Sequence, residues 1–339
     1  MNYRYIGNSD LKVSALCLGC MTFADPATDE DTCRTILGRA IERGINFVDT
    51  ADIYGTDGRS ERILGRWLKD SGSRKDLVVA TKYRFRAREQ TAKAKTERRK
   101  VLEACEASLT RLQTDCIDLY QIHMQDNRSR DEDVLRALDD LVRQGKVRHT
   151  GCCNYAAHRL VDSLWLSTMN DLPRFATLQV QYSLIERGIE REHVPACFRH
   201  GVGIMAWGPL AFGFLAGRHR RGRGAVEGTR LSRQGSAYQR LDNARNWAIL
   251  SAVRNIAREL GATAAQVSLA WLLRRKSVWG VVFGARSVEQ LDENVGAGSL
   301  MLPDCHVQAL DDISAPIYGY PYDMIDRAQG TSADSSLGR

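Results

Sequence analysis

Eight short apolar runs, alternating with stretches of helical length, constrain the fold of this 339-residue chain more than any other feature. The runs are Ala15–Cys20, Ile45–Thr50, Leu77–Lys82, Cys116–His123, Val147–Cys153, Thr177–Ser183, Gly203–Pro209 and Trp279–Ala285. Near-continuous apolar strands separated by amphipathic helices indicate a parallel sheet covered by helices. Eight such units predict an α/β fold of the (β/α)8 TIM-barrel type, with a doubly wound sheet as the structural competitor.

The stretches between the runs carry apolar residues at helical spacing, and most begin near Asp, Ser, Thr or Asn, which favour helix N-termini. Examples are Asp29–Arg43, Ser60–Lys69, Glu97–Leu112, Asp131–Gln144, Ala156–Met169 and Ser287–Val295. Residues 3–13 alternate around the turn-rich Gly7-Asn8-Ser9-Asp10 and predict an N-terminal hairpin over 1–14. We therefore expect a single barrel domain over 1–339, with this hairpin at its start and a C-terminal tail over 314–339.

Composition and charge exclude several classes of protein. The chain is 43% hydrophobic and 26% charged, as in an ordinary globular protein, and no stretch approaches the roughly 20 apolar residues of a membrane span. The net charge of +7 is a modest excess of 48 Lys and Arg over 41 Asp and Glu. We therefore expect a cytoplasmic protein with no membrane and no nucleic-acid partner.

Nine cysteines lack the even count and the spacing of a disulfide framework, so we expect reduced thiols. Cys17 and Cys20 form a C-x-x-C, but residues three apart on a strand point to opposite faces, and we predict no metal site there. Cys152 and Cys153 should diverge for the same reason. The Gly-rich segment 201–206 leads into a strand, whereas a dinucleotide fingerprint follows a strand and opens a helix, so we interpret it as a turn.

Four polar residues occur where predicted barrel strands end. Asp49 lies at the end of the second run, Tyr54 follows five residues later in its loop, and Lys82 and His123 close the third and fourth runs. Active sites of (β/α)8 barrels lie at this C-terminal rim. A nearby ammonium lowers the pKa of a phenol, so we predict Tyr54 as a general acid assisted by Lys82. Asp49 would hold Lys82 charged, and His123 would orient a carbonyl oxygen.

These segments resemble the aldo-keto reductase superfamily, whose Asp-Tyr-Lys-His tetrad and (β/α)8 barrel match in order and setting over nearly the whole chain. The resemblance includes bacterial members related to channel β-subunits. It implies an NADP-dependent oxidoreductase that reduces an aldehyde or ketone to an alcohol by hydride transfer from NADPH. Tyr54 would then be the proton donor, assisted by Lys82, Asp49 and His123.

The resemblance also implies a set of cofactor contacts and no metal. Those toward the nicotinamide are Gly19, Cys20, Met21, Asp49, Cys153, Asn154, Gln179 and Trp207. Those toward the pyrophosphate are Gly208, Pro209, Leu210, Gly213, Leu215 and Arg218. Those toward the adenosine are Arg230, Gly284, Arg286, Gln290, Glu293 and Asn294. Arg286 would face the 2′-phosphate that distinguishes NADP from NAD, while Cys153 and Gly208 stand where the family usually has Ser.

The strongest charge run follows Lys82 and leaves the substrate class open. It consists of Arg84, Arg86, Arg88, Lys93, Lys95, Arg98, Arg99 and Lys100, against Glu89 and Glu97. The run over 84–100 is interpreted either as a solvated surface or as a funnel for an anionic carbonyl substrate. The competing functions are a general carbonyl reductase, a reductase of a phosphorylated or nucleotide-linked sugar, and a non-catalytic redox-sensor subunit. His123 favours turnover, because the resemblance implies Asn at this position in channel subunits.

Overall fold

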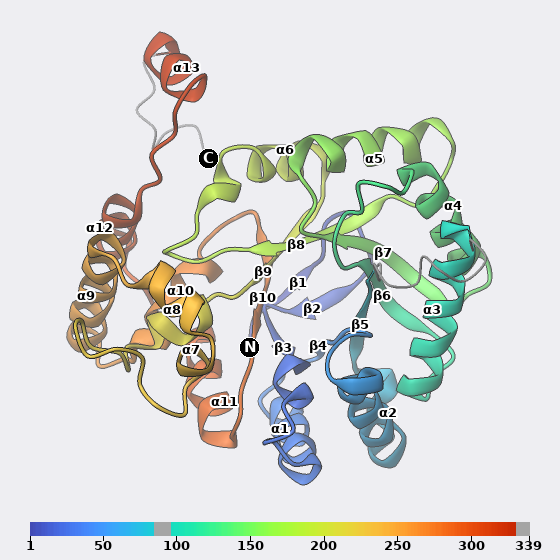
Figure 1. Ribbon diagram of the computed structural model, residues 1–339, viewed down its shortest axis with the longest axis horizontal. Helices are drawn as coiled ribbons and strands as arrows, with labels where there is room; N and C mark the ends of the chain where they lie inside the picture. Colours follow the sequence, from blue (N-terminus) through green and yellow to red (C-terminus); the bar gives the residue numbers. More distant parts are fainter. Residues whose placement is uncertain (85–95, 330–339) are drawn as a thin grey trace.

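The computed structural model describes residues 1–84 and 96–329, and its centre is a closed parallel barrel with the strand order β10-β3-β4-β5-β6-β7-β8-β9. The barrel strands are β3 (Leu16–Gly19), β4 (Phe47–Asp49), β5 (Val78–Tyr83), β6 (Ile117–Ile122), β7 (Val147–Cys153), β8 (Phe175–Gln181), β9 (Gly203–Trp207) and β10 (Val278–Phe283). Each strand falls on one of the eight apolar runs. The predicted barrel is therefore confirmed over the doubly wound sheet (Figure 1).

Helices surround the barrel (Figure 1). They are α1 (Glu30–Glu42), α2 (Arg59–Ser71), α3 (Glu97–Leu112), α4 (Asp131–Arg143), α5 (Ala157–Met169), α6 (His193–His200), α7 (Arg230–Arg233), α8 (Gly235–Leu241), α9 (Ala244–Glu259), α10 (Ala264–Leu273), α11 (Val288–Val295), α12 (Asp304–Ser314) and α13 (Tyr322–Gln329). Short 3-10 turns are η1 (Cys20–Ala24), η2 (Thr56–Gly58), η3 (Ser73–Asp76), η5 (Gly188–Glu190), η6 (Ala211–Ala216) and η7 (Gly296–Gly298). Asp29, Thr96 and Ser287 cap α1, α3 and α11 by accepting a backbone hydrogen bond, as their sequence positions indicate.

The predicted N-terminal hairpin closes the end of the barrel at which the strands begin. Strands β1 (Tyr3–Tyr5) and β2 (Lys12–Ser14) pair antiparallel, with Tyr3 opposite Ser14. Side chains of the hairpin and of the strands form one apolar cluster inside the barrel. Its members are Ile6, Leu11, Val13, Cys17, Phe47, Val78, Ala80, Leu119, Met205 and Val282. The part of the barrel interior next to the hairpin is therefore a packed core, as in other barrels of this type.

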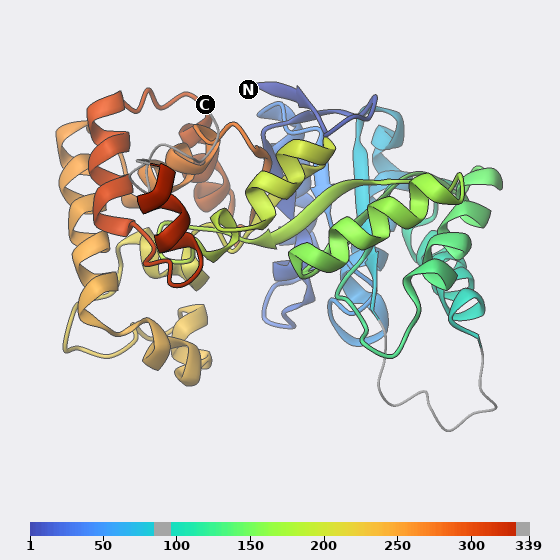
Figure 2. The ribbon, with the colours of Figure 1, turned by 90° about the horizontal axis from the view of Figure 1, so that it is seen from above.

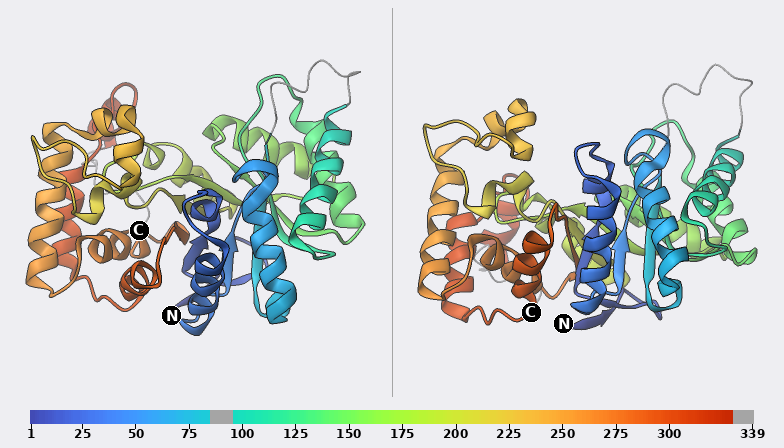
Figure 3. Two further views of the ribbon diagram at one scale, coloured as in Figure 1. Left: turned by 60° about the horizontal axis from the view of Figure 1, so that its bottom comes forward. Right: turned by 90° about the horizontal axis from the view of Figure 1, so that it is seen from below.

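Inward positions change from apolar to polar toward the C-terminal ends of the strands. Because side chains alternate along a strand, Ala80 and Leu119 of the apolar cluster are followed on the inward face by Lys82 and Gln121. Asp49 ends β4 in the same way, two residues after Phe47. The loops after β4 and β6, and the segment containing α7 and α8, lie on one side of the barrel (Figure 3).

The cysteines are free, as predicted. Cys17 belongs to the cluster inside the barrel, while Cys20 packs in the cluster between strands and helices. Within residues 1–84 and 96–329, no group of three or more His, Cys, Asp or Glu side chains is arranged to hold a metal. A search of the same residues finds no helix with the length and apolar character needed to cross a membrane.

The C-terminal segment continues beyond α12, which ends at Ser314. Within the predicted tail, α13 contacts the region before α6, where the Tyr322 hydroxyl donates to a carboxylate oxygen of Glu192 at 2.7 Å. Helices α5 and α6 lie side by side on the outer surface of the barrel (Figure 2). Residues 330–339 lie outside the described part of the tail.

Candidate active site

The four residues predicted as the tetrad come together at the C-terminal rim. Strand pairing places Asp49 opposite Ala80 and Lys82 opposite Gln121, so the ends of β4, β5 and β6 are neighbours. Tyr54 enters from the loop after β4, and His123 immediately follows β6. We refer to Asp49, Tyr54, Lys82 and His123 as the tetrad.

Lys82 lies at the centre of the tetrad and is fully buried. Its Nζ lies 2.5 Å from Oδ2 of Asp49 and 2.8 Å from the carbonyl oxygen of Thr50. The same Nζ lies 3.3 Å from the Tyr54 hydroxyl. The rings of Tyr54 and His123 meet edge to face, with centroids 5.8 Å apart and planes at 83°. Two side chains that can donate to a carbonyl oxygen therefore lie next to each other.

Neighbouring charges and burial shift the pKa values of the tetrad in opposite directions. Burial alone would lower the pKa of the Lys82 ammonium, but attraction to Asp49 outweighs it and holds this pKa above its usual value. For Tyr54 burial dominates, and its pKa lies above 10 even though the charge of Lys82 lowers it. Lys82 does lower the Tyr54 pKa, as predicted, but burial of the phenol raises it by more, so the net direction is opposite to the one expected from the sequence.

The surroundings of His123 favour its neutral form. Burial, followed by the positive charges of Lys82 and Arg84, lowers the pKa of His123 to about 3. Its Nδ1 is buried and has no hydrogen-bond partner among the residues the structure describes. A neutral imidazole has one donor nitrogen and one acceptor nitrogen, so His123 can still donate a single hydrogen bond to a substrate oxygen.

Gln121 was not predicted as a site residue, yet its amide forms a hydrogen bond with the carboxylate of Asp49. Its Nε2 donates to Oδ1 of Asp49 at 3.3 Å, and Nε2 of Gln179 donates to the same oxygen at 2.9 Å. Both oxygens of the buried Asp49 are thus occupied, one by two amides and the other by Lys82. The signal in the sequence was a polar residue on the inward face of an apolar strand, two positions before His123.

The residues expected around a nicotinamide adjoin the tetrad and each other. The amide nitrogen of Asn154 donates to the carbonyl oxygen of His123 at 3.0 Å, and Nε1 of Trp207 donates to Oδ1 of Asn154 at 2.9 Å. The thiol of Cys153 lies 3.6 Å from Oε1 of Gln121. Cys153 and Gln179 therefore extend the same buried polar layer.

The predicted contacts on the segment from Gly19 to Met21 differ in burial. Cys20 is fully buried, and its thiol lies 3.8 Å from the carbonyl oxygen of Leu18 within its own segment. Gly19 directly precedes η1, and a Cβ added to Gly19 would lie 2.9 Å from the side chain of Val282. Met21 is partly exposed. The structure thus turns the side chain of Cys20 into the outer core and leaves Met21 at the surface.

The loop after β9 has an unusual backbone. Gly208 has φ of 64° and Gly213 of 94°, and Ala211 and Phe212 between them also have positive φ. A Ser at position 208, as the family usually has, would adopt this conformation only with strain. Pro209, Leu210 and Leu215 belong to the same turn, and Leu215 is buried beneath it.

Three arginines from α7 and the segment before α11 lie close together, two of them against Asp25, and we call them the arginine cluster: Arg230, Arg233 and Arg286, with Asp25. Arg233 pairs with Asp25 at 2.7 Å, and Arg286 lies 3.8 Å from the same oxygen. The guanidinium of Arg230 stacks 4.8 Å from the centroid of the Phe212 ring. Burial and the neighbouring arginines lower the pKa of Arg230 and of Arg286. The cluster therefore holds an excess of positive charge.

Sequence reasoning found Arg230 and Arg286 but missed Arg233 and Asp25, which lie 208 residues apart. Gln290 supports the cluster, since its Oε1 accepts from the backbone N–H of Arg286 at 3.0 Å. The remaining predicted adenosine contacts lie on or beside α11. They are Gly284, Glu293 and the buried Asn294. Arg218 is exposed, and its charge acts on the adjacent His219.

The basic run divides into two parts. Arg98 pairs with Asp140, Arg99 with Glu103 and Lys100 with Glu97, all on the outer helices α3 and α4. These three residues belong to a solvated helix surface. Arg84 differs because its charge acts on His123. Arg86, Arg88, Lys93 and Lys95 lie outside the described residues.

Comparisons with known proteins show the family of this chain. A profile of the Aldo/keto reductase family matches residues 15–315. The uncharacterized oxidoreductase YrpG of Bacillus subtilis is 34% identical over 92% of this chain and 96% of its own length. Aldo-keto reductase AMT2 of Alternaria alternata is 36% identical over 91% of this chain and 90% of its own. Versiconal hemiacetal acetate reductase of Aspergillus parasiticus is 31% identical over 93% and 98%. The chain is therefore an oxidoreductase of the aldo/keto reductase family.

Proposed function

We propose that this protein is an NADPH-dependent carbonyl reductase that converts an aldehyde or ketone to the alcohol. The observation that carries the proposal is the position of Lys82, buried between Asp49 and the hydroxyl of Tyr54, with His123 against the Tyr54 ring. A proton donor, a fixed positive charge and a neutral hydrogen-bond donor meet there at one rim of the barrel. Carbonyl reduction uses these three groups.

The arginine cluster fits a cofactor that carries a phosphate on its ribose. Arg230, Arg233 and Arg286 have only Asp25 as an acidic partner among the described residues, so a phosphate would neutralise charge that is now unbalanced. At the other end, Gln179 and Asn154 would hold the carboxamide, with Trp207 beside the ring. When bound, NADPH supplies the hydride.

The chain's own residues control the proton. A developing alkoxide is more basic than a phenolate, so the Tyr54 hydroxyl, which is protonated at neutral pH, donates to it. Lys82 stabilises the phenolate that remains, and it stays charged because Asp49 lies against it. Neutral His123 orients the carbonyl oxygen with one hydrogen bond. Gln121 and Gln179 fix the position of the Asp49 carboxylate by donating to its Oδ1.

The test is NADPH consumption with a panel of neutral aldehydes, ketones, quinones and anionic sugars, compared with NADH at equal concentration. We expect turnover of at least one neutral carbonyl class and a preference for NADPH. Tight NADPH binding without turnover of any substrate would instead support a redox-sensor subunit. Because all nine thiols are free, we also propose a cytoplasmic location.

A second candidate, reduction of an anionic sugar carbonyl, rests on Arg84. This residue follows β5 directly and is close enough to His123 for its charge to lower the His123 pKa. If the substrate is anionic, Arg84→Ala should lower kcat/KM for anionic carbonyls and spare neutral ones. Arg98→Ala is the matched control, because Arg98 pairs with Asp140 on the outer surface.

A further inference from the structure

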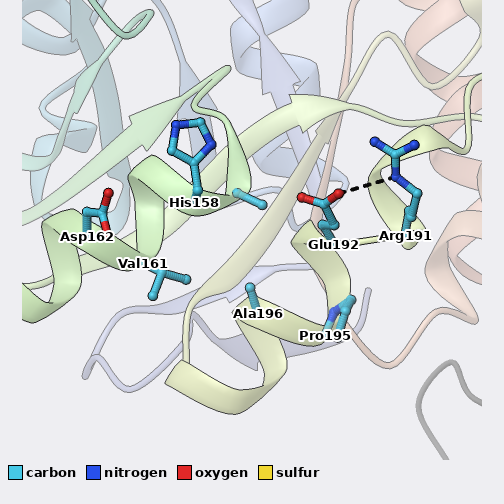
Figure 4. A pocket seen from close by; sticks show the side chains of 8 residues that line it. His158, Val161, Asp162, Arg191, Glu192, Pro195 and Ala196 are labelled. Carbon is cyan, nitrogen blue, oxygen red and sulfur yellow. Dashed lines mark ion pairs between the residues drawn. The ribbon is translucent and has the colours of Figure 1, made fainter. Parts of the chain in front are cut away.

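A groove on the outer surface of the barrel, between α5 and α6, is not used by the proposed reaction. It has two continuous parts of about 450 and 480 Å³, which share Val161 of α5 and Pro195 and Ala196 of α6. Figure 4 shows the first part, with Asp162 on one wall and Glu192 on the other. The second part is lined by Trp165 and Arg199. We call this surface the α5–α6 groove.

Two aromatic side chains on these helices are exposed to an unusual degree. Trp165 of α5 is 57% exposed, and Phe198 of α6 is 71% exposed. An aromatic side chain that becomes buried removes about 150–250 Å² from water, so these two leave on the order of 250 Å² of apolar surface uncovered. A stable interface covers about 800 Å² on each partner and has an apolar centre. The two rings could supply a large part of such a centre.

The charges in the groove are arranged so that it complements itself. At one end, Arg191 and Glu192 neutralise each other at 3.4 Å, which leaves Asp162 as the unbalanced charge (Figure 4). At the other end, Arg199 is the unbalanced charge. Neither Asp162 nor Arg199 has an ion-pair partner within the part of the chain that the structure describes. A groove that is acidic at one end and basic at the other is complementary to its own copy turned by 180°.

We propose that the α5–α6 groove is the interface of a homodimer with two-fold symmetry. In such a dimer Asp162 of one copy faces Arg199 of the second copy, and the reverse contact forms at the other end. Trp165, which lines the groove, buries its exposed face in this contact, and the exposed Phe198 of the same helix pair adds apolar surface to it. A nucleic acid fits this surface less well, because Asp162 repels phosphates, and a lipid surface would not engage the acidic and basic ends together.

The test measures the mass of the purified protein by sedimentation at increasing concentration. We expect the wild type to reach twice the chain mass of 37.9 kDa. Asp162→Arg and Arg199→Asp should each weaken dimerisation about 100-fold, because each places two like-charge contacts across the two-fold axis. An equimolar mixture of the two variants should dimerise again, since both contacts become attractive in the heterodimer.

Matched controls distinguish dimerisation through this interface from nonspecific association through exposed apolar surface. Met301→Asp changes another exposed apolar residue, 83% exposed and before α12, and should leave the mass unchanged. All variants should keep wild-type circular dichroism and NADPH binding, because the groove lies outside the barrel wall. A monomeric wild type at high concentration would overturn the proposal. So would a dimer that both charge variants leave intact, or single variants whose mixture stays monomeric.

Discussion

The tetrad and the arginine cluster lie on the same rim but differ in how they hold charge. Lys82 is completely buried, and its charge is matched at short range by Asp49. The arginines are partly exposed, with Arg286 31% and Arg233 47% accessible, and these two positive charges share Asp25 while Arg230 lies beside them. Buried charge is rigid and costly to unbalance, whereas half-exposed charge is adaptable and screened by salt. The first arrangement suits chemistry at a fixed point, and the second suits recognition of an exchangeable anion.

The largest expected effect is on the buried side of this comparison. Lys82→Met should lower the free energy of unfolding by about 3–5 kcal/mol, because the Asp49 carboxylate is left buried without its partner. Carbonyl reduction should fall by about 10²–10⁴-fold as well. Chemical denaturation and steady-state rates measure both effects. The double variant Asp49→Asn/Lys82→Met should regain part of the stability and none of the activity.

The arginine cluster should respond in affinity and not in stability. Arg286→Ala should raise the Kd for NADPH by about one to two decades, since a charged hydrogen bond contributes roughly 1.5–3 kcal/mol. The Kd for NADH should stay nearly constant. Arg233→Ala should act in the same direction. Fluorescence titration at two salt concentrations checks this, and equal losses for both cofactors would mean that the cluster does not read the ribose phosphate.

A smaller effect concerns acid stability. An unfolded histidine titrates near 6.5, but folded His123 titrates near 3, so between these values only the unfolded chain binds the proton. The free energy of unfolding therefore falls as the pH drops below 6.5, by about 3 kcal/mol at pH 4.5 from this residue. Urea denaturation of His123→Asn should show a shallower loss between pH 7.5 and 4.5. Parallel pH curves for the variant and the wild type would contradict the assigned shift.

The smallest effect is expected where charges are already paired on the surface. Arg98→Glu and Arg99→Glu should change stability by less than about 1 kcal/mol each, because exposed ion pairs contribute little. Neither change should alter selectivity between anionic and neutral substrates, in contrast to Arg84→Ala. Kinetics with matched anionic and neutral aldehydes separate these positions. A selective loss in Arg98→Glu would extend the functional part of the basic run onto α3.

The sequence was sufficient for the barrel and for the tetrad because both depend on short-range patterns. Apolar runs defined the strands, and the residue at the end of each run could be placed at the rim. To predict the contact of Gln121 with Asp49, one has to know which residues of β6 point into the barrel and where Asp49 lies on β4. Asp25 and Arg233 are joined only by the folded loop, so no local pattern connects them. The direction of the Tyr54 pKa depended on burial, which the sequence does not fix.

The most direct test of the proposed mechanism is single-turnover NADPH oxidation by Tyr54→Phe, with the NADPH Kd measured on the same sample. Phe removes the hydroxyl beside Lys82 and little volume. The mechanism predicts that aldehyde reduction falls by about 10²–10⁴-fold while the cofactor Kd is unchanged. A variant that keeps most of its rate would show that Tyr54 is not the proton donor.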